Sequence, residues 1–191
     1  LIYPEVSKGK YIEKPPVNEF ERYFISCDYG TVNPTSMGLW GLYKGVWYRF
    51  DEFYYSSRLE GRQLTDEEYY EHLLTFSSGR KIEAVIIDPS AASFIQCIRR
   101  HGFFSVIPAK NDVTGGIRKV QSAFRQGQII ISPLCKAAIR EFSLYRWDDN
   151  SGKDTPKKEN DHAMDEIRYF VLTVLSQEKD EDDFFVLSAT R

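Results

Sequence analysis

The chain has 191 residues, of which 42% are hydrophobic, and a formal net charge of −3 at pH 7. This length suits one domain with a full hydrophobic core, and the composition is that of an ordinary globular protein. No apolar run approaches the length of a membrane span and the first residues lack a signal-peptide pattern, so we expect neither a membrane protein nor a secreted one. The negative charge counts mildly against a nucleic-acid partner, because tight duplex binders usually carry a basic surface.

Three cysteines, Cys27, Cys97 and Cys135, are widely spaced and lie among apolar residues. An odd number with this spacing favours neither a disulfide framework nor a zinc site. We therefore expect buried free thiols in a reducing compartment.

The first 21 residues carry three prolines and show little periodicity, which predicts an irregular linker from an upstream domain. Since the chain opens at Leu1 rather than at a methionine, we expect it to be a fragment of a longer protein.

Three consecutive strands are predicted next. Residues 23–28 form an apolar strand that ends in Asp28 and a tight turn. Residues 35–43 and 46–54 are rich in aromatic and β-branched residues and are separated by a Lys-Gly pair, which predicts a β-hairpin. These segments indicate an antiparallel meander.

Beyond the hairpin, helices and strands alternate. Thr65 and the three acidic residues after it form a capping signature, which predicts a helix to about Ser78. The later predicted elements are a strand at 82–87 ending in Asp88, a helix at 91–101, a strand at 104–108, a helix through 117–124, a strand at 128–131, a helix at 133–146, a polar loop at 148–160, a helix at 161–176 and an acidic tail at 178–191. A meander joined to such alternating units is the RNase H-like arrangement, an α/β fold with a mixed sheet and helices on both faces, and we expect it over residues 22–177.

Carboxylates follow two of the predicted strands. Asp28 closes the first strand and Asp88 closes the fourth, and in this topology the two strands can lie side by side and point the same way. His162 and Asp165 lie three residues apart in the first turn of the last helix and so share one surface of it. An apolar stripe lies roughly opposite Asp165, at Ala163, Ile167, Phe170 and Val174. The sequence therefore predicts that three carboxylates and an imidazole meet at one sheet edge.

Such a cluster suits two-metal phosphodiester hydrolysis, with Asp28, Asp88 and Asp165 as catalytic metal ligands. Oxygen ligands favour Mg²⁺ or Mn²⁺, and an imidazole tilts the preference toward Mn²⁺. Each residue also has a structural alternative. Asp88 fits a turn or helix cap, Asp165 a pair with Arg168, and Asp161 the N-cap of the last helix, while His162 is compatible with a purely structural role.

Three motifs together resemble the C-terminal nuclease domain of the large terminase subunit of tailed bacteriophages. They are Ile25-Ser26-Cys27-Asp28-Tyr29-Gly30, Val85-Ile86-Ile87-Asp88-Pro89-Ser90 and the stretch from Asn160 to Tyr169, and the last is the most specific. The resemblance covers about residues 23–176.

This resemblance implies a metal-binding triad of Asp28, Asp88 and Asp165, with His162 as an additional ligand. It also implies cleavage of double-stranded concatemeric viral DNA during genome packaging, in the cytoplasm of the infected bacterial host. The partners that it implies are an upstream ATPase domain of the same protein, a small terminase subunit and a portal protein.

Cations near the predicted cluster are candidates for binding DNA phosphates. Those that follow the strand ends or occupy the loop before the last helix are Lys110, Arg118, Lys119, Lys153, Lys157 and Lys158. We interpret the loop 148–159 as a flexible flap over the site. Two alternatives stay open: a Holliday-junction-resolvase-like nuclease of the same fold, and a docking module of the packaging motor without catalysis.

Overall fold

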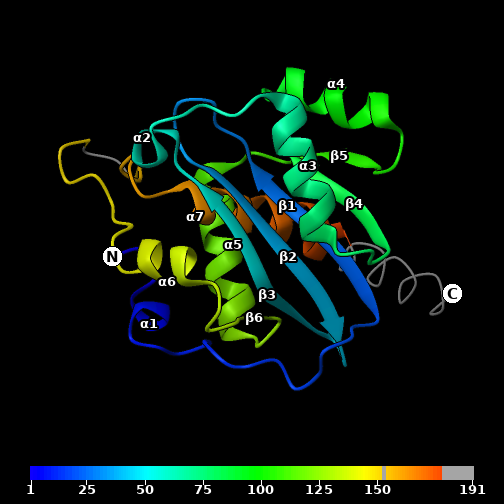
Figure 1. Cartoon of the computed structure of the whole chain (residues 1–191). Helices are drawn as coiled ribbons and strands as arrows, with labels where there is room; N and C mark the ends of the chain where they lie inside the picture. The colour runs from blue at the N-terminus through cyan, green and yellow to red at the C-terminus, as the bar shows by residue number, and fades with distance from the viewer. Residues whose placement is uncertain (152–153, 178–191) are drawn as a thin grey trace, which may run out of the picture.

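The computed structural model describes residues 1–151 and 154–177 of the chain. Its centre is a six-stranded sheet in the order β5-β4-β1-β2-β3-β6 (Figure 1). The strands are β1 (Arg22–Asp28), β2 (Thr35–Tyr43), β3 (Val46–Tyr55), β4 (Ile82–Ile87), β5 (Val106–Pro108) and β6 (Ile129–Ile131). β1, β2 and β3 are antiparallel, whereas β4 runs parallel to β1, β5 to β4 and β6 to β3. The predicted mixed sheet is confirmed.

The hairpin between β2 and β3 has the turn that its sequence predicts. Lys44 has φ 47° and Gly45 has φ 78°, so both central residues occupy the left-handed region. Two such residues form the type I′ turn, whose twist matches that of the flanking strands.

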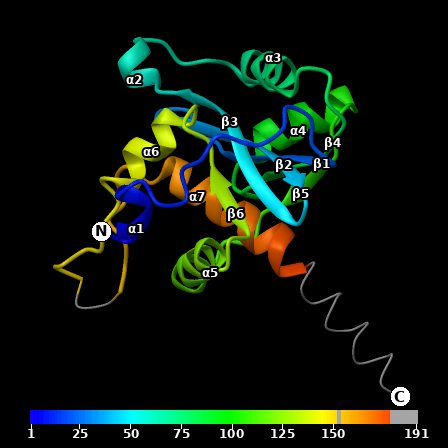
Figure 2. The ribbon, with the colours of Figure 1, turned by 90° about the horizontal axis from the view of Figure 1, so that it is seen from below.

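The helices cover both faces of the sheet. They are α1 (Pro4–Ser7), α2 (Ser57–Glu60), α3 (Asp66–Ser77), α4 (Ala92–His101), α5 (Val113–Arg125), α6 (Lys136–Phe142), α7 (His162–Phe170) and its π-helical continuation η1 (Val171–Leu175). α3 and α4 pack on one face with their own apolar core, and α5 and α7 pack on the other (Figure 2). No helix in the described ranges is both long and apolar enough to cross a membrane.

Several elements differ from their predicted bounds. The helix predicted over 133–146 is shorter and spans only α6, and the short helix α2 has no counterpart among the predicted elements. The segment predicted as an irregular linker contains α1 and buries Ile2, Tyr3 and Val6 in the core of the α7 face. Ile2 also donates its backbone N–H to the carbonyl of Tyr145, 3.0 Å away. The predicted acidic tail lies outside the described residues.

A fully buried ion pair fixes α7 on the sheet. Glu166 of α7 accepts a 2.7 Å hydrogen bond from Nε of Arg49 on β3, and a second one from the hydroxyl of Ser26 on β1. Both charged side chains have no solvent exposure. On β2, Gly38 leaves the space for them, since a Cβ there would lie 2.6 Å from Nε of Arg49. The ion pair therefore sets the position of α7 across three strands.

We predict that Arg49→Met lowers the free energy of unfolding by about 3–5 kcal/mol, because it leaves the buried Glu166 carboxylate without its partner. The double variant Arg49→Met, Glu166→Met should recover a large part of this loss. Urea unfolding measures both values. Arg62→Met breaks an exposed pair with Glu68 and is the control, with an expected change of about 1 kcal/mol or less. Equal losses for Arg49→Met and Arg62→Met contradict the prediction.

Candidate active site

Two carboxylates leave the sheet at the same edge. β1 and β4 are parallel neighbours, and Cys27 pairs with Ile87 in their register. Asp28 and Asp88 are the next residues on each strand, so they extend from adjacent strand ends. Both side chains are partly buried.

α7 brings a third carboxylate and an imidazole to this edge. Nδ1 of His162 lies 2.9 Å from Oδ2 of Asp28. One turn further along α7, Asp165 accepts a 2.8 Å hydrogen bond at Oδ1 from the guanidinium of Arg168. The pair between Asp165 and Arg168, which the sequence offers as a structural alternative, is thus present within the candidate site.

The start of α7 is capped by a neighbouring helix. Asp161 occupies the N-cap position of α7, as predicted, but its side chain makes no capping hydrogen bond. Instead Glu141 of α6 accepts a 2.7 Å hydrogen bond at Oε2 from the backbone N–H of Ala163. Its other oxygen accepts one from the hydroxyl of Tyr54, also at 2.7 Å. α6 therefore holds the turn that carries His162.

Asn111, a residue that the sequence analysis did not single out, links two of the carboxylates. Its Nδ2 donates to Oδ2 of Asp88 at 2.7 Å, and its Oδ1 accepts from Arg168 at 2.7 Å. Because Arg168 also binds Asp165, a continuous hydrogen-bonded chain joins Asp88 to Asp165. Asn111 follows β5, which ends at the same sheet edge as β1 and β4. Its position after a predicted strand could therefore have marked it as a candidate site residue.

Asp88 also forms the turn that the sequence analysis gave as its structural alternative. Its Oδ1 accepts the backbone N–H of Ser90 at 2.8 Å, which closes a turn at the end of β4. This bond and the one from Asn111 fix both oxygens of the carboxylate. The turn therefore orients Asp88 toward the site, and the two roles are compatible.

The site concentrates negative charge. Burial raises the pKa of the Asp28 carboxyl, and the charge of Asp165 raises it further against the opposing hydrogen bond from His162. Burial and Asp165 also raise the pKa of Asp161, while Lys158 lowers it. The phenol of Tyr169 on α7 interacts with Asp28, Asp165 and Asp88, which, after burial, raise its pKa. A cation is the natural counterpart of such a cluster.

The donor set fits a hard divalent cation. Three carboxylates and one imidazole are the ligand types that suit Mg²⁺ and Mn²⁺. Oδ1 of Asp28 and Oδ2 of Asp165 accept no hydrogen bond from the described residues and so keep free lone pairs. The ligand groups are spread more widely than a compact single-ion cluster, since no three of these four residues present ligand atoms that all lie within 4.8 Å of one another.

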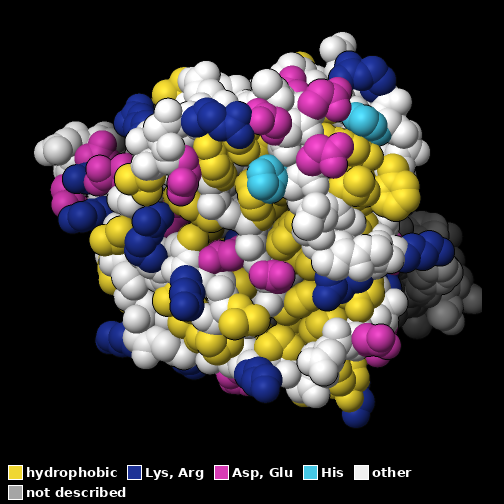
Figure 3. Space-filling view, in the orientation of Figure 1, with side chains coloured by type: hydrophobic (Ala, Val, Ile, Leu, Met, Phe, Trp, Pro, Cys, Tyr) yellow, Lys and Arg dark blue, Asp and Glu magenta, His cyan; other side chains and the backbone are white. Residues whose placement is uncertain are grey.

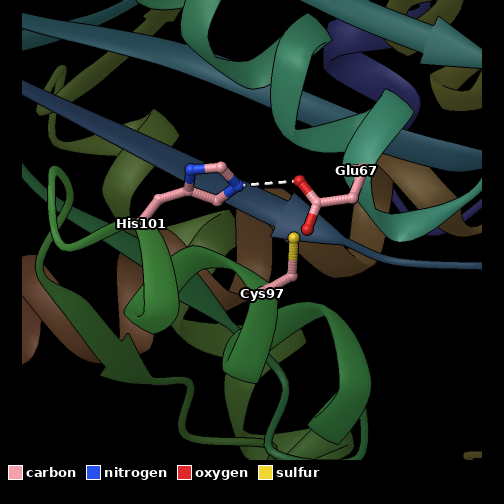
Figure 4. Close-up of side chains that lie close together, drawn as sticks. All are labelled: Glu67, Cys97 and His101. Atoms are coloured by element: carbon pink, nitrogen blue, oxygen red, sulfur yellow. Dashed lines mark hydrogen bonds and ion pairs between the residues drawn. The ribbon is translucent and has the colours of Figure 1, made fainter.

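A tighter cluster of potential ligands lies elsewhere, between α3 and α4 (Figure 4). Glu67, Cys97 and His101 present ligand atoms that all lie within 4.8 Å of one another. Glu67 already accepts hydrogen bonds from Arg100 and from His101, the latter at 2.7 Å. Burial raises the pKa of the Cys97 thiol to about 11, so the thiol stays protonated at neutral pH. We interpret this cluster as a packing contact between the two helices.

All three cysteines are buried free thiols, as predicted. Cys27 on β1 and Cys97 on α4 belong to the core of the α3 and α4 face, whereas Cys135 belongs to the other core.

The predicted DNA-binding cations occupy different places. Nζ of Lys119 binds Ser176 at the far end of the last helix, and Arg118 is exposed beside it on α5. Lys110 follows β5, with its backbone N–H bound to Thr173. Lys157 and Lys158 lie in the loop before α7, and Lys153 lies outside the described residues. Among the described ones, only Lys158 lines the groove that also contains His162.

The chain was compared with known proteins. No protein-family model matches it. It is 46% identical to the large terminase of a thermophilic bacteriophage, solved in complex with ADP, over 91% of this chain and 44% of that one, with a TM-score of 0.87. It is also 24% identical over 156 residues to the terminase large subunit of Escherichia phage T5, covering 78% of this chain and 35% of that protein. The chain thus spans less than half the length of these relatives.

A solved domain with lower sequence identity has a similar fold. The nuclease domain of the large terminase from bacteriophage SPP1, solved with bound Mn, is 18% identical and has a TM-score of 0.60. The match covers 83% of this chain and 92% of that domain. The described part of this chain therefore has the fold of a whole terminase nuclease domain.

The contact between His162 and Asp28 predicts a pH effect. Burial alone would lower the pKa of His162, but the hydrogen bond and charge of Asp28 outweigh it, so the pKa lies above its ordinary value of 6.5. The protonated imidazole therefore stabilises the fold below pH about 6.5, and this contribution is lost as the pH rises through the raised pKa. In metal-free protein, NMR titration should show a lower pKa of His162 in Asp28→Asn. Asp149→Asn, which removes an exposed carboxylate, is the control, and an unchanged pKa in Asp28→Asn contradicts the prediction.

Proposed function

Because this chain is related to the phage large terminases and has the fold of their nuclease domains, we propose that it is the metal-dependent endodeoxyribonuclease of such a protein. It cuts concatemeric viral DNA during genome packaging. The observation that carries the proposal is the meeting of Asp28, Asp88 and Asp165, from β1, β4 and α7, at one sheet edge.

The carboxylates and His162 would hold two divalent ions, Mg²⁺ or Mn²⁺. Bound Mn in the related SPP1 nuclease domain supports this choice of metal. Such ions supply an activated water and stabilise the leaving oxygen of a phosphodiester. Two ions about 3.5–4 Å apart need ligands spread over a wider area than one ion does, in keeping with the open arrangement here.

The protein's own contribution is to orient these ligands. His162 holds one oxygen of Asp28, Asn111 holds one oxygen of Asp88, and Arg168 holds one oxygen of Asp165. The remaining oxygens of Asp28 and Asp165 are left to bind metal. Partners of this kind fix the direction of ligand lone pairs and keep the site assembled between turnovers.

The proposal extends to the wider setting of the domain. The large terminase of the thermophilic bacteriophage was solved in complex with ADP, which supports an ATPase domain in the same protein as this nuclease. The small terminase subunit and the portal protein are its further partners, and the host cytoplasm is the place of action. The loop 148–159 serves as a flap over the DNA.

The proposal predicts that the protein nicks and linearises plasmid DNA with Mn²⁺ and that EDTA abolishes the activity. Asp28→Asn, Asp88→Asn and Asp165→Asn should each lower the rate by about 10²-fold or more, because a metal ligand contributes several kcal/mol to the transition state. Glu71→Gln, which removes an exposed carboxylate from α3, is the matched control, and circular dichroism verifies folding.

Three results contradict the proposal or its details. Full activity in all three variants shows that the site is elsewhere. A strong preference for branched DNA together with stable dimers favours the junction-resolvase alternative. Absence of Mn²⁺ binding by calorimetry, with no cleavage, favours a docking module.

Asn111 gives a separate prediction as a positioning residue. Asn111→Ala removes the link between Asp88 and Arg168 and should lower the affinity for Mn²⁺ by about 10–100-fold, as is typical for the partners of metal ligands. Calorimetric titration measures it, and Asn150→Ala in the loop is the control. The prediction is wrong if Asn111→Ala changes thermal stability but leaves Mn²⁺ affinity unaltered.

A further inference from the structure

A groove of about 350 Å³ adjoins the candidate active site. Its walls come from the loop after β1, the end of β3, α2, α6 and the segment before α7. Three cations line it: Arg58 of α2, Arg140 of α6 and Lys158. Figure 3 shows dark-blue side chains over the region of α2 and α6, on the left of the view.

These cations are exposed and form no salt bridge with the described residues. Within residues 1–151 and 154–177, no ion pair includes Arg58, Arg140 or Lys158. Other arginines near the sheet are neutralised, as Arg49 is by Glu166 and Arg168 by Asp165. The cations of the groove therefore keep donors that no salt bridge of the described residues occupies.

Arg140 is held in place without being neutralised. Its guanidinium lies over the ring of Tyr54, 5.3 Å from the centroid. Tyr54 is fixed in turn by its hydrogen bond to Glu141. A guanidinium stacked on an aromatic ring keeps its N–H donors free for a phosphate.

His162 connects the groove to the carboxylates. It lines the groove and, through Nδ1, contacts Asp28 at 2.9 Å. A chain that fills the groove therefore reaches the candidate metal ligands without crossing another part of the surface. This continuity favours the substrate itself as the occupant over an unrelated acidic peptide.

We propose that this groove binds the sugar-phosphate backbone of the DNA strand beside the scissile bond, with Arg58, Arg140 and Lys158 each contacting a phosphate. The proposal rests on the proposed nuclease function and adds to it the path of the substrate. Contacts to phosphates position a strand without reading its sequence. Glu159 is the one acidic side chain among the groove residues that the structure describes, so the local charge is positive although the whole chain carries −3.

The test measures binding of a short labelled DNA duplex by fluorescence anisotropy in EDTA, where no cleavage occurs, at salt concentrations from about 50 to about 200 mM. The variant Arg58→Ala, Arg140→Ala, Lys158→Ala should lower the salt slope of log K by about 2.7, since each phosphate contact contributes about 0.9. Affinity at low salt should fall at least about tenfold.

Two further variants serve as controls. Lys8→Ala, Lys44→Ala, Lys81→Ala removes the same charge from exposed positions outside the groove and should leave the salt slope and the affinity close to wild type. Arg58→Lys, Arg140→Lys keeps the charge and should retain most of the slope. Thermal unfolding verifies that all variants are folded.

Cleavage of plasmid DNA with Mn²⁺ is measured in parallel and separates the two proposals. If wild type cleaves plasmid and the groove variant has an unchanged salt slope and KM, the DNA-binding role of the groove is wrong. The nuclease function is then still supported. If the groove variant loses DNA binding but wild type does not cleave, the DNA-binding role of the groove is supported and the nuclease function is wrong. An equal loss of affinity in the control variant Lys8→Ala, Lys44→Ala, Lys81→Ala, or tighter binding of an acidic peptide than of DNA to the groove, also overturns the proposal.

Discussion

The buried ion pair between Arg49 and Glu166 is the constraint on which the site depends. Two charges without solvent exposure are costly unless each has a close partner, so α7 is stable on the sheet only where its Glu166 meets Arg49 and Ser26. One residue back from Glu166 is Asp165, and one turn back is His162. A shift of α7 along its axis would separate these side chains from Asp28 and leave the buried Glu166 carboxylate without its charged partner, although Arg49 would keep its salt bridge to Glu52. The buried pair therefore fixes the geometry of the surface cluster.

The cluster itself is organised by hydrogen bonds between its own side chains. Asp28 is bound by His162, and Asp88 is joined to Asp165 through Asn111 and Arg168. These contacts leave some carboxylate oxygens free while fixing the others. Arg168 is neutralised within the site, whereas Arg58 and Arg140 are not. The two kinds of cation therefore have different roles: the buried one supports acidic ligands, and the exposed ones attract an anionic chain.

The sequence predicts the sheet and the strand ends well, because apolar strands that stop at Asp28 and Asp88 have local patterns that tertiary packing does not override. The burial of Glu166 with Arg49 could not be predicted in this way, because isolated charged residues are usually solvated. Only the fold shows that the two side chains are buried together. The contacts of Asn111 and Glu141 could not be predicted either, because their partners are far away along the chain. α2 is too short to leave a periodic signal, so the position of Arg58 was also not predictable. The burial of Ile2 and Tyr3 was not predicted, because the prolines in the first segment indicate an irregular linker.

The packing of that first segment gives the fold a mechanical path. Ile2 is bound to Tyr145 just after α6, and α6 supplies Glu141, whose carboxylate caps the first turn of α7. Tension applied at the beginning of the chain would act on α5, where Gln121 binds the carbonyl of Ile2, and on the end of α6, which also caps the turn that holds His162. The anchor of the first segment and the cap of α7 therefore lie next to each other at the end of α6.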